Sequence, residues 1–229
     1  MKFTSTLIKG KLIKRYKRFF IDIKVNNTTL TAHCPNTGSM MGLLDKGNET
    51  WISKNNDPKR KLKYTLEIIK SKKKLVGVNT HRANRIVEDG LKNKLFEEFK
   101  SVKMIKPEFK FSNDTRFDFL CDKNIIEVKN VTLLRKKELA EFPDAITSRG
   151  SKHLLQLIKS LEKGYKPYVL FLTQIQDINS FKIAKDIDND YYQNYLIAKK
   201  AGVKFLAYRC KLNSKEIKIE KKINILNDW

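Results

Sequence analysis

The stretch Arg116-Phe117-Asp118-Phe119-Leu120, a turn at Asp122 to Asn124, and Ile125-Ile126-Glu127-Val128-Lys129 predict a β-hairpin in the second half of the chain. Successive side chains along a strand point to opposite faces. Glu127 and Lys129 are therefore expected on one face, and the apolar residues between and before them on the other. A carboxylate and an ammonium group would then share one surface.

A second carboxylate can join this surface. If Asp118 lies at the end of the first strand that faces Glu127, the two acids supply oxygen ligands of the kind that Mg²⁺ favours. Lys129 would then position or activate a water molecule and add positive charge beside a phosphate. Such a site hydrolyses phosphodiesters. A surface Glu-Lys pair on an amphipathic strand is the alternative, because many unrelated strands contain acids and a lysine at this spacing.

Helical and strand patterns on both sides of the hairpin predict an α/β domain, which we place at residues 79–229. Apolar residues with helical spacing precede the hairpin, at Ile86, Val87, Leu91, Leu95, Phe96 and Phe99. Pro143 is expected to open a second helical segment that ends before Gly164. A third runs from Asp190 to Lys200 and ends at Gly202. Apolar strands are expected at 168–173 and 203–208.

The first 78 residues, in contrast, show strand patterns without helical periodicity between them. Apolar and polar residues alternate from 19 to 25, Asn26-Asn27 predicts a turn, and a returning strand is expected at 28–33. Further strands are expected near Trp51, at 62–69 and at 75–79. Several short strands in succession favour a compact β-barrel or sandwich, which we place at residues 1–78.

The charge of the chain favours a polyanionic partner. Lys and Arg number 48 against 25 Asp and Glu, which gives a formal net charge of +23 over 229 residues. Such an excess favours nucleic acid over a membrane surface. No apolar run approaches the ~18 to 20 residues that cross a bilayer, and no secretory core is visible. Three scattered cysteines are typical of a reducing compartment, so we expect a cytoplasmic protein without a membrane partner.

Two basic segments of the first domain are candidates for DNA contact. One interleaves bases with aromatic side chains, at Lys14, Arg15, Tyr16, Lys17, Arg18 and Phe19, and the other contains Lys59, Arg60 and Lys61. Basic groups neutralise phosphates, while aromatic faces stack on unpaired bases. The alternative is a solvated strand face with Phe19 in the core. The histidines and cysteines show no zinc-ligand spacing, and we assign them no metal.

Several segments, in this order, resemble the sugar fermentation stimulation protein A (SfsA) family over nearly the whole chain. They are Leu12-Ile-Lys-Arg-Tyr-Lys-Arg-Phe19, Thr31-Ala-His-Cys-Pro-Asn-Thr-Gly-Ser-Met40, Pro58-Lys-Arg-Lys-Leu62, Val76-Gly-Val-Asn-Thr80, Glu127-Val-Lys-Asn-Val-Thr-Leu133, Phe142-Pro-Asp-Ala145, Arg149-Gly150 and Lys152-His-Leu154. The resemblance implies an α+β protein of two domains, an N-terminal OB-like β-barrel followed by an α/β domain of the PD-(D/E)xK nuclease type. It also implies DNA binding and a link to the regulation of sugar metabolism, particularly of maltose.

Carried onto this sequence, the resemblance implies a nuclease-type site at Asp118, Glu127 and Lys129. An upstream acid would come from the first helix at Asp89, with the neighbouring Glu88 as the fallback. Asp118 and Glu127 would be the ligands of a Mg²⁺ or Mn²⁺ cofactor.

Basic residues around this cleft, among them Arg149 and Lys152, are expected to contact DNA. The leading hypothesis is a DNA-binding protein with little sequence preference. The main alternative is an active, divalent-metal-dependent DNA endonuclease that uses the same cleft. An RNA-binding or membrane-surface protein would rely on the same charge, and the sequence indicates no oligomeric state.

Overall fold

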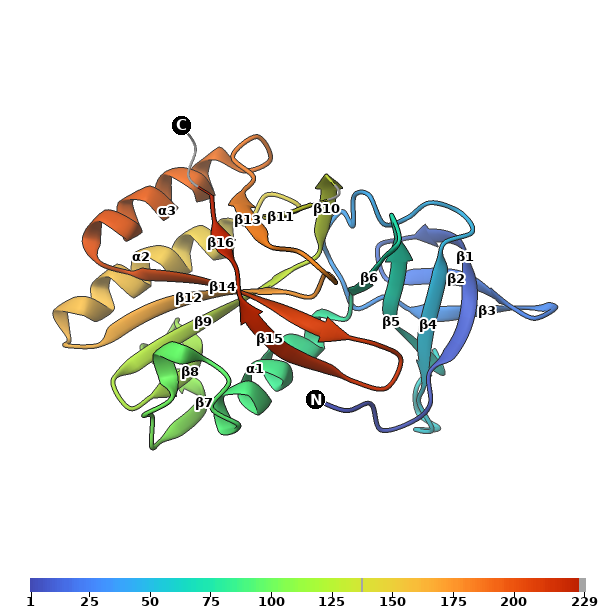
Figure 1. The fold of residues 1–229 in the computed structure, drawn as a ribbon, viewed down its shortest axis with the longest axis horizontal. Helices are drawn as coiled ribbons and strands as arrows, with labels where there is room; N and C mark the ends of the chain where they lie inside the picture. Colours follow the sequence, from blue (N-terminus) through green and yellow to red (C-terminus); the bar gives the residue numbers. More distant parts are fainter. Residues whose placement is uncertain (137, 227–229) are drawn as a thin grey trace.

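The computed structural model describes residues 1–136 and 138–226. The chain forms two lobes side by side, one built from its first strands and the other from all of its helices and the later strands (Figure 1). Within the described residues, no helix is both long and apolar enough to cross a membrane.

The first lobe is a β-barrel, as the strand pattern predicts. Its strands are β1 (Ile8–Tyr16), β2 (Phe20–Val25), β3 (Thr28–His33), β4 (Glu49–Lys54), β5 (Tyr64–Ser71) and β6 (Lys74–Gly77). They run in the order β3-β2-β1-β4-β5-β6, and a bridge from His33 to Thr65 joins β3 to β5 and closes the barrel. The predicted alternation in β2 is confirmed, because Ile21 and Ile23 are fully buried in the barrel core.

The second lobe is organised around a mixed sheet in the order β15-β14-β12-β9-β8-β7. Its strands are β7 (Ile105–Lys110), β8 (Arg116–Cys121), β9 (Asn124–Val131), β12 (Lys166–Thr173), β14 (Lys204–Leu212) and β15 (Ile217–Lys222). The central strand β12 is parallel to both of its neighbours, whereas β8 and β9 form the predicted antiparallel hairpin. A smaller sheet contains β10 (Leu133–Lys136), β11 (Leu139–Phe142), β13 (Ser180–Ile183) and β16 (Asn224–Ile225).

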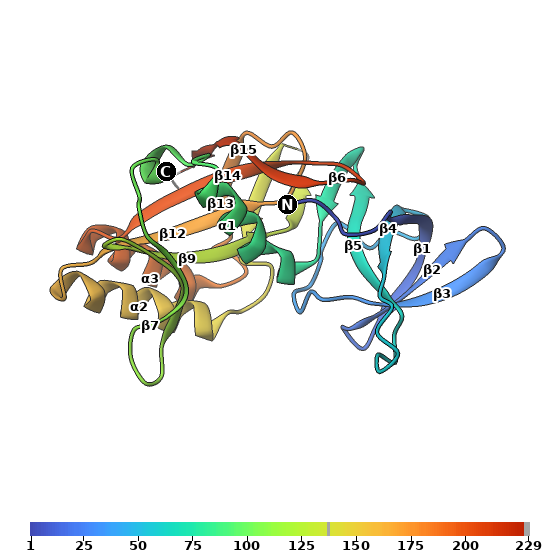
Figure 2. The same ribbon diagram turned by 90° about the horizontal axis from the view of Figure 1, so that it is seen from below.

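Helices cover both faces of the larger sheet (Figure 2). On one face α2 (Ser148–Glu162) and α3 (Asn189–Ala201) lie against each other, and α1 (Ala83–Lys92) lies on the other face with the 3-10 turns η1 (Thr80–Arg82) and η2 (Glu97–Phe99) at its ends. The two hydrophobic clusters follow this division, since Leu154 of α2 belongs to one and Ile86 of α1 to the other. The hairpin strand β9 is thus buried on both faces.

Two predicted helix boundaries are wrong. The first helix ends at Lys92 instead of continuing to Phe99, because the chain turns back at Lys94 and the Phe96 ring packs against Gly90. A Cβ atom at Gly90 would lie 2.7 Å from that ring. The second helix begins at Ser148, not at Pro143, and the Thr147 side chain accepts a hydrogen bond from the third residue of the helix.

The two lobes are joined by backbone pairing and by a buried carboxylate. The Gly77 amide of β6 donates to the Gln174 carbonyl of the second lobe over 2.8 Å. Glu67 of β5, whose side chain is fully buried, accepts hydrogen bonds from Arg82 at 2.7 Å and Asn79 at 2.9 Å, both at the start of the second lobe. A buried carboxylate that is paired in this way fixes the segment between the lobes.

Replacing this carboxylate should destabilise the protein. Glu67→Ala leaves the Arg82 guanidinium and the Asn79 amide without their acceptor, so we expect a loss of about 2 to 4 kcal/mol in the free energy of unfolding. Glu49→Ala is the matched control, because Glu49 is a barrel-strand acid paired with Lys9 and Lys70 at the surface. Its loss should cost less than about 1 kcal/mol. Urea denaturation of both variants measures the difference, and equal losses would contradict this role of Glu67.

Candidate functional site

Asp118 lies where the hairpin ladder ends. Backbone pairing between β8 and β9 runs as far as Phe119 and Ile126. Beyond that point the Asp118 carboxylate turns toward β9 and accepts a hydrogen bond from the Val128 amide at 2.7 Å. Its other oxygen accepts from the Asn84 side chain of α1, also at 2.7 Å. The carboxylate is therefore held by two donors from different elements.

Glu127 and Lys129 share one face of β9, as the alternation predicts. The Lys129 ammonium donates to a Glu127 carboxylate oxygen at 2.7 Å, and Nδ1 of His153 lies 2.6 Å from the same oxygen. His153 belongs to α2, so this helix also contributes to the site. Glu127 is 5% exposed, whereas Asp118 and Lys129 retain partial exposure.

Burial and mutual repulsion set the charge of the two acids. Burial, and then the nearby negative charge of Glu127, raise the pKa of Asp118 to about 6, although hydrogen bonds from Val128 and Asn84 oppose the rise. Burial would also raise the pKa of Glu127, but Lys129 and His153 outweigh it, so the net pKa of Glu127 is lowered. One carboxyl group thus has a raised pKa and its neighbour a lowered one. Perturbed pKa values of this kind cluster at functional sites, and an added cation would stabilise the ionised form of both acids.

The donor set of the site fits a hard divalent ion. Within the described residues, no group of three or more His, Cys, Asp or Glu side chains is arranged to hold a metal. Mg²⁺, however, is commonly held by one or two carboxylates and completes its shell with water. Asp118 and Glu127 would be those two carboxylates, and burial together with the charge of Glu127 raises the pKa of Asp118, so an added cation would favour its ionised form.

The structure does not bring Asp89 to this place. Its carboxylate lies 3.0 Å from the amino group of Met1, and the fallback residue Glu88 pairs with Lys92 one turn along α1. Residues three or four apart share a helix face. Glu88 thus shares the face of Asn84, which touches Asp118, whereas Asp89 is turned away from it.

A basic pocket of about 750 Å³ opens beside the site, between the β7–β8 hairpin and α2. Its lining combines five basic side chains with one acid, Asp114, and the bases are Lys110, Arg116, Arg149, Lys152 and Lys159. The sequence-predicted residues Arg149 and Lys152 are thus brought together. His153 lines this pocket and also contacts Glu127, so it connects the basic surface with the buried acids.

The basic segments of the first lobe divide into exposed and structural residues. Lys14, Lys17, Arg18, Lys59, Arg60 and Lys61 are exposed. Arg15 instead donates to the backbone carbonyls of Asn36 at 2.7 Å and Gly38 at 3.0 Å, so its guanidinium holds a loop. Tyr16 stacks on Phe20 and donates its hydroxyl hydrogen to Asp22. These contacts compete with the DNA contacts expected of Arg15 and Tyr16.

Two residues of the site were missed by the sequence reasoning, Asn84 and His153. Asn84 belongs to the helical pattern, and its distance from the hairpin in sequence hides its contact with Asp118. His153 lies in the Lys152-His-Leu154 segment, and its place on the half-buried face of α2, one residue before a core leucine, was the available signal.

These observations define a class of protein: a small β-barrel joined to an α/β domain whose sheet carries one buried acid, one half-buried acid and a lysine beside a basic pocket. Family models match both parts, "SfsA N-terminal OB domain" at residues 13–78 and "Sugar fermentation stimulation protein RE domain" at residues 81–216. The chain belongs to the sugar fermentation stimulation protein (SfsA) family.

Relatives match over nearly their whole length. A sugar fermentation stimulation protein homolog of Pelagibacter ubique is 65% identical over 99% of this chain and 100% of its own. Homologs from Pseudoalteromonas atlantica and Bartonella quintana are 40% and 39% identical over at least 99% of the chain. A solved structure, SfsA of Pyrococcus furiosus in complex with Ca²⁺, has a TM-score of 0.87 over 99% of this chain and 98% of its own, at 23% identity. This last likeness supports the fold.

Ionised Asp118 should lower the free energy of unfolding of the metal-free protein at neutral pH. Because its pKa in the fold, about 6, exceeds the ordinary 3.8, the folded state binds the proton more tightly, and stability falls as the pH rises through this interval. Asp118→Asn carries no charge and can keep both hydrogen bonds if the Asn84 amide turns over. In EDTA the free energy of unfolding of the variant should exceed that of wild type by on the order of 1 to 3 kcal/mol at pH 8, and by less at pH 5.

Urea denaturation at the two pH values measures this difference. Asp177→Asn is the control, because Asp177 is an exposed acid of the same lobe at a positive φ that asparagine tolerates. A gap between Asp118→Asn and wild type that is independent of pH would contradict the assigned titration.

Proposed function

We propose that this chain is a DNA-binding protein that grips the phosphate backbone with little sequence preference. The observation that carries this proposal is the basic pocket between the β7–β8 hairpin and α2. Five Lys and Arg side chains and one acid line it, and His153 in its lining also contacts Glu127. The net charge of +23 and the exposed Lys and Arg side chains of the first lobe add further positive charge. Point charges on flexible side chains recognise phosphates without reading base edges.

DNA affinity should therefore depend steeply on salt. Arg149→Ala and Lys152→Ala should each reduce the slope of log K against log salt by about 1, since each removes one phosphate contact. Lys211→Ala, which removes an exposed lysine on β14, should leave the slope unchanged. Fluorescence anisotropy with a labelled duplex at several KCl concentrations provides the slopes. Identical slopes in all four proteins would remove the pocket from the interface.

A second function is favoured by the intact acid-lysine set, namely a divalent-metal-dependent DNA endonuclease with a domain of the PD-(D/E)xK nuclease type. Asp118 and Glu127 would hold Mg²⁺ or Mn²⁺, which lowers the pKa of a bound water and offsets charge on a phosphate. The solved relative described as a complex with Ca²⁺ adds support, because Ca²⁺ also prefers oxygen ligands.

The chain's own residues would share the remaining work. Lys129 is fixed by its 2.7 Å contact with Glu127 and would place positive charge beside the scissile phosphate. His153 of α2 contacts the same carboxylate oxygen, so the orientation of Glu127 depends on how α2 packs against β9. Arg149 and Lys152, one helical turn or less from His153, would hold a neighbouring phosphate.

The endonuclease proposal predicts nicking of supercoiled plasmid by wild type with Mg²⁺ or Mn²⁺ and none with EDTA. Asp118→Asn and Lys129→Met should each lower the rate at least 100-fold, because each removes charge from the reacting phosphate's surroundings. Asp177→Asn should cut at the wild-type rate. Equal nicking rates in all four proteins would show that a contaminant or another site cuts the plasmid, and they would contradict the proposal.

We propose that the sugar-related role of the family depends on DNA binding. Relatives are described as sugar fermentation stimulation protein homologs. We infer that a regulatory effect on sugar metabolism, including that of maltose, would follow from binding DNA in the cytoplasm. Buried thiols at Cys34, Cys121 and Cys210 support such a reducing setting.

A further inference from the structure

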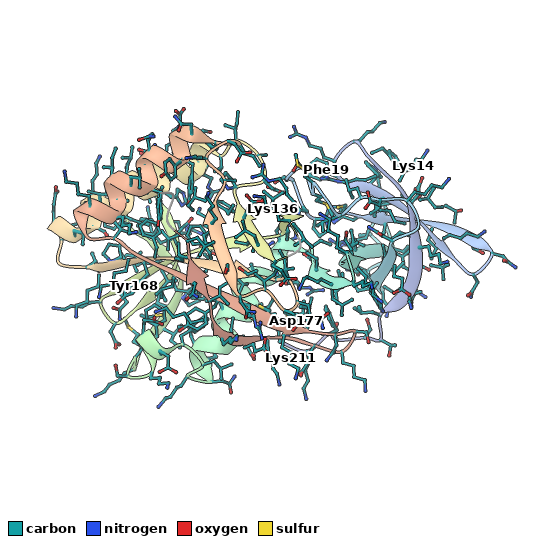
Figure 3. All side chains as sticks on the ribbon, turned by 45° about the horizontal axis from the view of Figure 1, so that its top comes forward. Lys14, Phe19, Lys136, Tyr168, Asp177 and Lys211 are labelled. Atoms are coloured by element: carbon teal, nitrogen blue, oxygen red, sulfur yellow. The ribbon has the colours of Figure 1, made fainter. Side chains whose placement is uncertain are left out.

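A row of rings lies on the first lobe where the chain passes toward the second. The Phe19 ring stacks on His33 with centroids 6.5 Å apart and planes 22° from parallel, and His33 in turn lies 6.4 Å from His81. These residues come from three separate segments, namely the β1–β2 turn, the end of β3 and η1. Figure 3 shows Phe19 on the edge of the barrel that faces the second lobe.

The outer rings of this row are open to solvent. Phe19 is 45% exposed and His81 is also exposed, so the reading that buries Phe19 in the core is wrong. Lys17 and Arg18, both with positive φ, form the turn that presents Phe19. Partial burial, then Arg60 and His81, lower the pKa of His33, which keeps its ring neutral at pH 7. A neutral ring between two others suits stacking.

A polar pocket of about 510 Å³ is lined by residues of both lobes. Arg18 and Thr80, the chain neighbours of Phe19 and His81, line it, together with Asn36, Asn130, Thr132, Thr147 and the acid Asp144. These side chains offer hydrogen-bond donors and acceptors in mixture, as the edges of a nucleobase require. The volume falls within the range of small-ligand sites.

One wall of this pocket has an unmet hydrogen-bonding group. The Asn130 side-chain oxygen accepts from Gln174 at 2.5 Å, while its buried nitrogen has no partner among the described residues. Turning both amides over would exchange the donor for an acceptor but leave one polar atom of Asn130 unpaired. A buried unpaired polar group is costly, so the Asn130–Gln174 pair is a strained part of the pocket wall.

The pocket is continuous in sequence with the acid site. Asn130 directly follows Lys129 on β9, so the strand that carries Glu127 and Lys129 also forms the pocket wall. The side chains of Asn130 and Lys129 point to opposite faces of this strand, so the pocket and the acids share β9 without forming one continuous surface.

We propose that this row binds an unpaired DNA strand: a base stacks on Phe19 beside His33 and His81, and an adjacent nucleotide enters the polar pocket between the lobes. In a duplex each base is stacked on its neighbouring bases, so a protein ring cannot stack on it. An unpaired base has a free face on which an aromatic side chain can stack. Arg18 at the pocket and Arg60 near His33 supply charge for the connecting phosphates. The inference rests on the proposed DNA binding and defines the strand that is bound.

The test compares single-stranded and duplex DNA of equal length and sequence by anisotropy in EDTA, so that no cutting occurs. Wild type should prefer the single strand. Phe19→Ala should weaken single-strand binding by roughly 5- to 100-fold, the usual effect of losing one stacked base, and leave duplex binding within twofold. Phe19→Trp should retain wild-type affinity, and Phe19→Leu should not. Ile197→Ala, which removes an exposed apolar side chain from α3, is the control.

The outcomes separate this inference from the DNA-binding proposal. If wild type binds neither form of DNA, the proposed function itself fails. If wild type binds DNA but Phe19→Ala binds the single strand as well as wild type does, the stacking row is overturned and phosphate binding stands. An oligonucleotide with 2-aminopurine gives an independent readout, because its fluorescence should be quenched by wild type and not by Phe19→Ala. Wild-type single-strand affinity in Phe19→Leu would show that an apolar side chain without an aromatic ring suffices, and it would likewise overturn stacking.

Discussion

Two carboxylates of one hairpin, Glu127 buried and Asp118 half-buried, impose the constraint that organises the second lobe. Burial acts to raise the pKa of both acids, and the negative charge of Glu127 raises the pKa of Asp118 further. The chain opposes this with groups from several elements: the Asn84 amide of α1, the Val128 amide of β9, the Lys129 ammonium and His153 of α2. Helices on both faces of the sheet are thereby tied to one short hairpin.

The compensation is unequal, and this inequality gives the site its character. Glu127 receives two cationic or polar partners and keeps a lowered pKa, whereas Asp118 receives neutral donors and has a pKa near 6. A fold selected for stability alone would not keep an acid in this state, because an uncharged side chain would satisfy the same donors. The remaining negative charge is what a divalent ion would neutralise, and the basic pocket beside it is where a phosphate would lie.

The sequence predicts the hairpin and the barrel well, because both rest on local alternation. Ile21 and Ile23 face the core, and Glu127 and Lys129 meet on one face, as a period of two requires. It fails where the outcome depends on contacts distant in sequence. Asp89 pairs with Met1 while Asn84 reaches Asp118, and a helical period cannot say which face meets the hairpin. The ring row of Phe19, His33 and His81 likewise exists only once three segments come together.

We propose that Asp118 and Glu127 together form a site for one divalent ion. Anomalous diffraction from a crystal soaked in Mn²⁺ at pH 8 tests it most directly, since both acids are then ionised. A single strong peak is expected within about 2.5 Å of oxygens from both carboxylates. Manganese peaks elsewhere on the molecule, with the space between these two acids empty, would contradict it.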